Sequence, residues 1–248
     1  MLAFFIMRLF GKKSTADAAS VVPKHIAFIM DGNRRWAKKR GKPTLFGHQK
    51  GAEAIEPVTR HLFARGVETI SLYAFSIENW ERSKEEVDYL MKFITSEMPK
   101  HIKRAMAENI RLKFIGRRNV LSAKIVKMFE SAERDTAENT AGTIVFAIDY
   151  SGKDEIIRAV NDMVGGAFPK PRTEITEELF ESYMDTGDLS PVDLVVRTSG
   201  EERISNFMLW KLAYAELMFI PEDWPAMNAK IADRILGEFS KRSRRFGK

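Results

Sequence analysis

The chain of 248 residues is long enough to bury one substantial hydrophobic core, and 44% of its residues are hydrophobic. It contains no cysteine, which excludes disulfides and thiolate metal sites and favours a cytoplasmic setting. A net charge of +6 and a pI of about 9.4 predict an anionic partner. Charge alone does not decide between nucleic acid, anionic lipid and a diphosphate.

The first ten residues are apolar except for Arg8. This stretch is much shorter than the roughly 20 residues of a membrane span, and it lacks the basic start and the cleavage site of a secretory signal. We expect residues 1–22 to form a flexible lead-in with at most a weak, peripheral membrane contact, and residues 23–248 to form a single catalytic domain.

Short apolar segments alternate with longer segments of helical periodicity. The expected strands are residues 25–30, 69–75, 111–115, 143–148, 193–196 and 217–220, and the expected helices are residues 52–65, 84–108, 122–138, 155–163 and 174–184, the last preceded by a loop at 165–171. This order predicts an α/β fold with a single domain, in which helices flank both faces of a largely parallel six-stranded sheet.

Polar residues follow five of the expected strands, at residues 31–33, 76–80, 116–118, 149–152 and 197–201. Because ligands of parallel sheets bind beyond the carboxyl ends of the strands, all five polar segments are expected at one edge. The site should therefore lie at that edge.

The segment from Asp31 to Trp36 joins the first strand to a basic, helix-compatible segment. Backbone N–H groups at such a junction attract anions. Gly32 allows close approach, Arg34 and Arg35 offer planar forks for phosphate oxygens, and Asp31 is a hard ligand suited to Mg²⁺. Because an Asp-Gly-Asn string is also ordinary turn chemistry, the motif alone leaves both interpretations open.

Four stretches resemble the cis-prenyltransferase family, which includes undecaprenyl diphosphate synthase: residues 25–41, 47–51, 72–82 and 193–224. They cover most of the chain, and the fourth is long and very specific. The resemblance implies a Mg²⁺-dependent isoprenyl transferase that condenses isopentenyl diphosphate with an allylic diphosphate such as farnesyl diphosphate. It implies new double bonds of Z geometry and a polyprenyl diphosphate product for a lipid carrier of cell-wall glycan synthesis.

The resemblance also implies roles for single residues. Asp31 would hold Mg²⁺ against the allylic diphosphate, and Glu216 would be a second metal carboxylate, acting through a partner subunit or through water. Asn79 would assist proton transfer, as a positioning or relay group because an amide is a poor base, with His48 and Ser76 as the alternatives. The residues expected around the substrates are Gly32, Asn33, Arg34, Arg35, Trp36, His48, Ser76, Ile77, Glu78, Trp80, Arg82, Arg197, Arg203, Ile204 and Ser205.

The lipid product requires an apolar tunnel. Ala74 and either Ile144 or Val145 are candidates for its wall, and plain core packing explains them at least as well. Departures from the family pattern bear on substrate preference and product length. Thr44 stands where many relatives carry an arginine, so one phosphate contact is expected to be lost or to be taken over by Lys42 or Lys50.

Two further segments depart from the family pattern: residues 116–118 replace a common Gly-Asp, and residues 150–153 replace Tyr-Gly-Gly-Arg. Near the C-terminus, Arg245–Phe246–Gly247 resembles a family motif that reaches the active site of a partner subunit, so a homodimer is expected. A solvated basic tail is the competing interpretation.

Other function classes fit less well. A trans-type prenyl synthase needs Asp-Asp motifs, and the sequence contains no Asp-Asp pair. A P-loop is also missing, and no nucleic acid is expected as a partner. The remaining alternative is a noncatalytic, short-chain or branching prenyl-diphosphate-binding homologue on the same fold.

Overall fold

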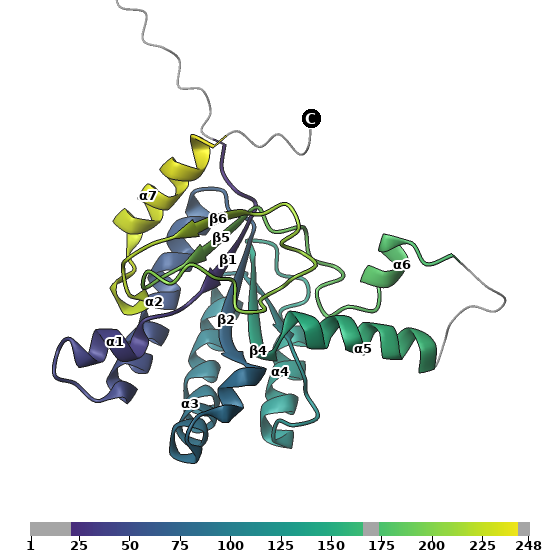
Figure 1. The fold of residues 1–248 in the computed structure, drawn as a ribbon, viewed down its shortest axis with the longest axis horizontal. Helices are drawn as coiled ribbons and strands as arrows, with labels where there is room; N and C mark the ends of the chain where they lie inside the picture. Colours follow the sequence, from purple (N-terminus) through teal and green to yellow (C-terminus); the bar gives the residue numbers. More distant parts are fainter. Residues whose placement is uncertain (1–20, 166–173, 243–248) are drawn as a thin grey trace, which may run out of the picture.

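A computed structural model describes residues 21–165 and 174–242 of the protein (Figure 1). Most of the expected lead-in, the loop after Gly165 and the Arg245–Phe246–Gly247 motif lie outside the described residues. Nothing tests those three expectations, so they stay predictions.

Six strands form one sheet in which all neighbours are parallel, in the order β3-β4-β2-β1-β5-β6. The strands are β1 (His25–Ile29), β2 (Thr69–Ser76), β3 (Arg111–Ile115), β4 (Thr143–Tyr150), β5 (Leu194–Arg197) and β6 (Glu216–Phe219). Parallel strands with both faces covered consist of nearly continuous apolar residues, which is why the sequence pattern identified them. The predicted single-domain α/β fold is confirmed.

The α-helices of the described residues are α1 (Asn33–Lys38), α2 (Thr44–Ala64), α3 (Lys84–Ala107), α4 (Ala123–Asp135), α5 (Gly152–Gly165), α6 (Glu177–Glu181) and α7 (Ala229–Ser240), with 3₁₀ turns η1 (Ile77–Glu81) and η2 (Trp224–Ala226). Side-chain caps begin several of them: Ser83, Ser122 and Asn228 each accept a hydrogen bond from the backbone N–H three residues later. Within the described ranges, no helix is long and apolar enough to cross a membrane.

Three helices differ from the sequence prediction. Helix α2 begins at Thr44 rather than at residue 52, because Gly47 and Gly51 lower helix propensity but allow α1 to pack closely. A Cβ atom on Gly47 would lie 2.0 Å from the carbonyl oxygen of Asn33. Helix α6 is limited to Glu177–Glu181, and α7 was not predicted although its apolar residues follow helical spacing.

The two faces of the sheet are covered differently. Helices α2, α3, α4 and α7 bury the larger core, which includes Phe28, Leu72 and Phe146. The other face packs against the chain between residues 186 and 215, with Phe207 and Met208 fully buried. Helices α5 and α6 pack against that segment and extend to the side of the molecule (Figure 1).

The strand order reverses at the centre of the sheet. From β1, the chain builds β2, β3 and β4 on one side and then returns to add β5 and β6 on the other. In open α/β sheets the crevice at such a reversal binds the ligand. Here it brings Asp31, just after β1, beside Arg197 at the end of β5.

Candidate active site

The turn after β1 depends on a glycine. Gly32 has φ of +99°, and a Cβ atom there would lie 2.5 Å from Asp223 Oδ1 and 2.8 Å from Ser199. Its backbone N–H donates to Asp31 Oδ1 at 2.7 Å. The glycine therefore fixes the position from which Asp31 faces the crevice.

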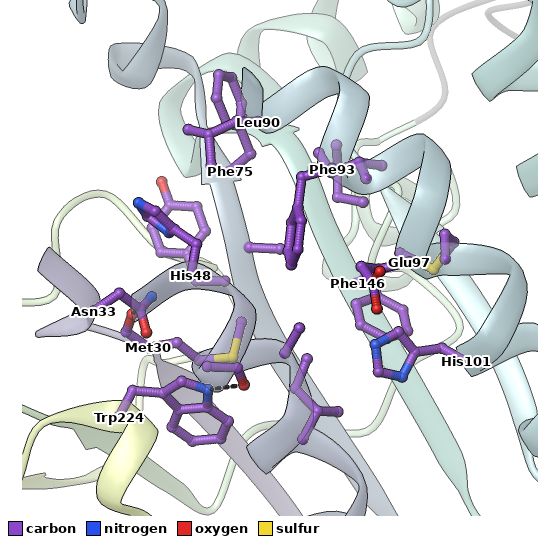
Figure 2. A pocket seen from close by; sticks show the side chains of 18 residues that line it. Met30, Asn33, His48, Phe75, Leu90, Phe93, Glu97, His101, Phe146 and Trp224 are labelled. Atoms are coloured by element: carbon purple, nitrogen blue, oxygen red, sulfur yellow. Dashed lines mark hydrogen bonds between the residues drawn. The ribbon is translucent and has the colours of Figure 1, made fainter. Parts of the chain in front are cut away.

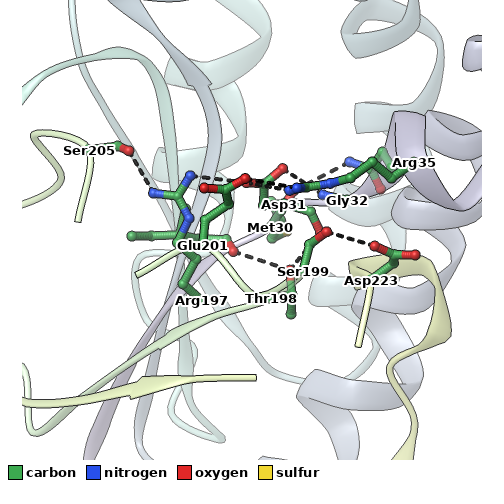
Figure 3. A network of polar contacts seen from close by, with 12 residues as sticks. Met30, Asp31, Gly32, Arg35, Arg197, Thr198, Ser199, Glu201, Ser205 and Asp223 are labelled. Atoms are coloured by element: carbon green, nitrogen blue, oxygen red, sulfur yellow. Dashed lines mark hydrogen bonds and ion pairs between the residues drawn. The ribbon is translucent and has the colours of Figure 1, made fainter. Parts of the chain in front are cut away.

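Two guanidiniums contact the Asp31 carboxylate (Figure 3). Arg197 donates to Asp31 Oδ2 at 3.0 Å, and Arg35 lies 3.1 Å from the same oxygen. Burial opposes ionisation of Asp31, but the hydrogen bonds from Arg197 and Gly32 and the charge of Arg35 outweigh it and lower the pKa of this carboxyl. Asp31 is therefore an anion in the resting protein.

The arginines belong to a larger network. Arg197, whose side chain is only 6% exposed, donates to Ser205 Oγ at 2.6 Å and to the carbonyl oxygen of Arg203. Ser205 has a positive φ of 47°, which places its hydroxyl toward the arginine. Glu201 links two arginines: its Oε1 accepts a hydrogen bond from Arg35 at 2.8 Å, and its Oε2 accepts one from Arg203 at 2.6 Å. In the resting protein these guanidiniums therefore pair with carboxylates, although their geometry also suits phosphate oxygens.

Asp223 supports the turn from behind. Its carboxylate accepts hydrogen bonds from Ser199 Oγ at 2.7 Å and Lys39 Nζ at 2.8 Å, and the side chain is 5% exposed. The next residue, Trp224, donates its backbone N–H to the carbonyl oxygen of Asp31 at 2.9 Å. Neither Asp223 nor Glu201 was among the predicted site residues. Both lie within the 193–224 stretch, which was the signal available for finding them.

The turn η1 forms another wall of the site. Ser76 and Asn79 make a capping box in which Asn79 Oδ1 accepts the backbone N–H of Ser76 at 3.2 Å. Glu78 accepts a hydrogen bond from Asn206, and Arg82 pairs with Glu86. The side chains of η1 that face the crevice are therefore held at fixed places.

His48 and Asn33 lie where three hollows meet. His48 Nε2 and Asn33 Oδ1 are buried and lack a hydrogen-bond partner within the described residues. Burial, followed by the charge of Arg82, lowers the pKa of His48 to about 4, so its ring is neutral near pH 7. Unpaired buried polar atoms are costly, and a ligand that hydrogen-bonds to them removes that cost.

Two of these hollows are polar. One is lined by Asp31, Ser76, Glu78, Asn79, Arg82, Lys153, Arg197, Ser205 and Asn206. The other is lined by Asp31, Gly32, Arg34, Arg35, Lys38, Lys42, Thr44, Arg82, Glu201 and Arg203. Lys42 and Thr44 both line the second hollow, whereas Lys50 pairs with Glu53 and lines neither polar hollow, and a phosphate contact by Lys42 stays a prediction.

The third hollow is apolar, with a cavity volume of about 110 Å³, and it runs between α2, α3 and β2. Figure 2 shows Asn33 and His48 at one end and His101 and Phe146 at the other. Ala74 lines it, but Ile144 lines a neighbouring cavity and Val145 lies in the core on the opposite face of the sheet. Alternation along β4 explains why Val145 does not line the hollow, because only every second side chain faces α3; Ile144 shares the face of Phe146 but lies further from the site along the strand.

Most of the predicted site residues line the two polar hollows. Among the exceptions in the described part of the chain, Trp36 stacks on Phe46, Ile204 packs on the second core, and Ile77 lies in η1. Trp80 donates to Asp149 behind η1, and Glu216 lies at the amino end of the edge strand β6, paired with Arg242. The described residues hold no cluster of three or more metal-ligating side chains.

This combination characterises an α/β protein whose site accepts an anionic group together with an apolar chain. A family model described as "Putative undecaprenyl diphosphate synthase" matches residues 29–247. An isoprenyl transferase from Neisseria meningitidis serogroup A is 43% identical over 239 residues, covering 95% of each chain.

Solved structures agree. Lavandulyl diphosphate synthase from Lavandula x intermedia, in complex with dimethylallyl diphosphate, has a TM-score of 0.84 at 29% identity and covers 94% of this chain and 100% of its own. A probable undecaprenyl diphosphate synthase from Campylobacter jejuni has a TM-score of 0.77 at 30% identity, with coverages of 91% and 99%. The chain belongs to the undecaprenyl diphosphate synthase family. The prediction of a cis-prenyltransferase is confirmed.

Proposed function

We propose that the protein condenses isopentenyl diphosphate with an allylic diphosphate such as farnesyl diphosphate, and that it forms a Z-configured polyprenyl diphosphate. The observation that carries this proposal is the meeting of two cationic hollows with an apolar cavity at Asn33 and His48. Each hollow offers guanidiniums for one diphosphate, and the cavity offers space for one hydrocarbon chain.

The two diphosphates are assigned to opposite sides of Asp31. Arg34, Arg35 and Lys42 receive the allylic diphosphate, whereas Arg197 and Ser205 receive that of isopentenyl diphosphate. The contacts of Asp31 and Glu201 with these arginines keep the cations in place until phosphate oxygens replace the carboxylates. The reacting carbon atoms are thereby held next to one another.

Asp31 fits a Mg²⁺ site of a particular kind. Mg²⁺ is commonly held by one or two carboxylates together with substrate phosphates and water, and an all-protein cage is unnecessary. Asp31 is ionised and lies between the two hollows, so it would hold the ion against the diphosphates. Bound there, Mg²⁺ would stabilise negative charge on the departing pyrophosphate.

Proton loss from the isopentenyl unit completes the reaction. Asn79 Oδ1 is tied to the backbone of Ser76, and an amide is a poor base, so Asn79 positions or relays the proton to a phosphate oxygen. His48 has a pKa of about 4 and donates a hydrogen bond to phosphate in this proposal. The released pyrophosphate carries the proton away.

We further propose a cytoplasmic homodimer whose lipid product contacts a membrane and serves as a carrier for cell-wall glycan synthesis. Glu216 lies at the amino end of the edge strand β6, whereas Asp31 follows the carboxyl end of β1, so a metal role for Glu216 requires a partner subunit. The apolar residues beside it support a partner at this edge, because Tyr214 is 72% and Leu217 is 42% exposed.

A short-chain or branching activity is the second candidate, favoured by the similarity to lavandulyl diphosphate synthase. The two candidates differ in product. Chromatography of dephosphorylated products made with dimethylallyl, geranyl and farnesyl diphosphate decides between them. Long polyprenols support the first candidate, and a product of two five-carbon units from dimethylallyl diphosphate supports the second.

Asp31→Ala tests the proposed reaction. Incorporation of labelled isopentenyl diphosphate in the presence of Mg²⁺ is expected to fall at least about 100-fold, because the variant loses the proposed metal ligand at the reacting centre. Asp188→Ala is the matched control: Asp188 pairs with Arg111 at the opposite end of the sheet. A wild-type protein without incorporation, or equal rates for both variants, contradicts the proposal.

A further inference from the structure

The sheet is irregular where β2 and β4 reach the site. Tyr73 pairs with Ala147, Phe75 with Ile148 and Ser76 with Tyr150. Ala74 is therefore an extra residue in β2, and Asp149 is an extra residue in β4. Such bulges redirect single side chains, and they are frequent beside active sites.

Asp149 is an unusual bulge residue. It is fully buried and has a φ of +54°, a conformation that is uncommon outside glycine but accessible to Asp and Asn. Arg117 grips its carboxylate through two hydrogen bonds, from Nε at 2.9 Å to Oδ2 and from Nη2 at 3.1 Å to Oδ1. The Arg117 backbone N–H also donates to the Asp149 carbonyl oxygen at 3.0 Å.

The same carboxylate holds the turn η1. Trp80 donates its indole N–H to Asp149 Oδ1 at 2.6 Å, and its ring packs edge-on against Phe75 at 5.4 Å. Trp80 and Asn79 are adjacent in η1, but Asn79 lines the polar hollow whereas Trp80 lines a separate groove beside α3 and α4. The turn is therefore anchored on one side and presents Asn79 on the other.

We propose that Asp149 and Arg117 are positioning residues that act through Trp80 to fix η1, and with it Asn79 and Ser76, at the wall of the site. This inference rests on the proposed condensation activity. Arg117 orients the carboxylate of Asp149 so that Oδ1 faces the indole of Trp80. The bulge places this carboxylate at the carboxyl end of β4, close to η1. Asp149, Arg117 and Trp80 line neither of the two polar hollows, so they act on turnover through the position of η1.

Trp80→Phe tests the anchor, since it removes the N–H donor and keeps an aromatic ring beside Phe75. We expect kcat to fall about tenfold or more, because small misplacements of reacting groups cost one to two orders of magnitude. KM for both diphosphates should change by less than about twofold, since the assigned Arg34, Arg35 and Arg197 lie on other elements. Arg82, which follows η1, is held separately by Glu86 on α3.

Trp210→Phe is the matched control. Trp210 also donates its indole N–H to a carboxylate, Glu181 Oε1 at 2.8 Å, but this pair joins α6 to the 186–215 segment away from the hollows. A merely structural role for the Trp80 bond predicts similar losses of kcat in both variants. That result, or an unchanged kcat in Trp80→Phe, overturns the inference.

Asp149→Asn tests the link to Arg117 and tolerates the positive φ. Its single oxygen must serve both Trp80 and Arg117, so kcat should fall, and adding Trp80→Phe should lower it little further. If the two fold-changes multiply instead, Trp80 does not act through Asp149 and the inference fails. If the wild-type protein shows no condensation activity, the proposed function itself fails. An active wild-type protein with the contrary variant results described here would contradict only the positioning role.

Discussion

At the residue scale, the site is organised by arginines whose partners in the resting protein are carboxylates. Arg197 is the most buried of them and contacts Asp31, Ser205 and the carbonyl oxygen of Arg203 at once. The planar guanidinium directs two separate nitrogens to these partners, whereas the donors of a lysine ammonium all sit on one atom. Arginine at position 197 therefore matters for the geometry of its donors as well as for its charge.

Arg197→Lys tests this difference. KM for isopentenyl diphosphate should rise about 10- to 100-fold, because at least one charge-assisted hydrogen bond of about 1.5–3 kcal/mol is lost. Steady-state kinetics at saturating allylic substrate measures the change. Arg118→Lys is the control, since Arg118 also donates to a carboxylate, through Nη2 to both oxygens of Glu133 on α4, and lines neither polar hollow. Equal KM values for wild type and Arg197→Lys would refute the assigned role.

The sequence located the residues that touch the hollows better than those that support them. Asp31, Arg197 and Ser205 lie in segments with a recognisable pattern. Asp223 and Asp149 act through contacts with residues far away in the chain, and a single polar residue gives no periodic signal. Their roles became visible only once the strands were arranged in space.

At the element scale, strands were easier to predict than helix boundaries. All six strands were identified because buried parallel strands are short apolar segments. The start of α2 was wrong because Gly47 and Gly51 weaken the local helical pattern while serving a tertiary contact with α1. Helix packing overrode propensity at these positions.

Gly51→Ala tests the contact between α2 and the β1–α1 turn. A Cβ atom there would lie 2.4 Å from Asn33 Oδ1 and 3.1 Å from Trp224, so we expect a loss of about 1–3 kcal/mol in the free energy of unfolding. Denaturant unfolding measures it. The control is Gly237→Ala in α7, where a Cβ meets nothing within 4 Å and should stabilise the protein by about 0.5–1 kcal/mol. A neutral Gly51→Ala would contradict the close packing.

At the scale of the whole molecule, strand order decides where the chemistry sits. The sequence predicted that polar segments share one edge of the sheet, but it did not give the order that puts β1 beside β5. That order depends on long-range pairing, which local patterns do not encode. The reversal between these strands brings Asp31 and Arg197 together although 166 positions separate them in the chain.

The burial of three histidines predicts how the free energy of unfolding depends on pH. Burial lowers the pKa of His25 to about 4, and it also lowers the pKa values of His48 and His101. An unfolded histidine titrates near 6.5, so below that pH the unfolded chain binds protons that the folded protein does not. Stability is therefore full above about pH 6.5 and is lost as pH falls toward 4.

His25 makes this prediction quantitative, since it is fully buried between Ser71 and Ser190. Between pH 7 and pH 5 it should remove about 2 kcal/mol from the free energy of unfolding. Urea unfolding at constant ionic strength measures the difference, and His25→Gln should reduce it by a similar amount. The Asp and Glu side chains with lowered pKa values lose their contribution in a more acidic range, so they do not mask the effect. Equal stability of the wild-type protein at pH 7 and pH 5 would show that these rings are protonated in the fold.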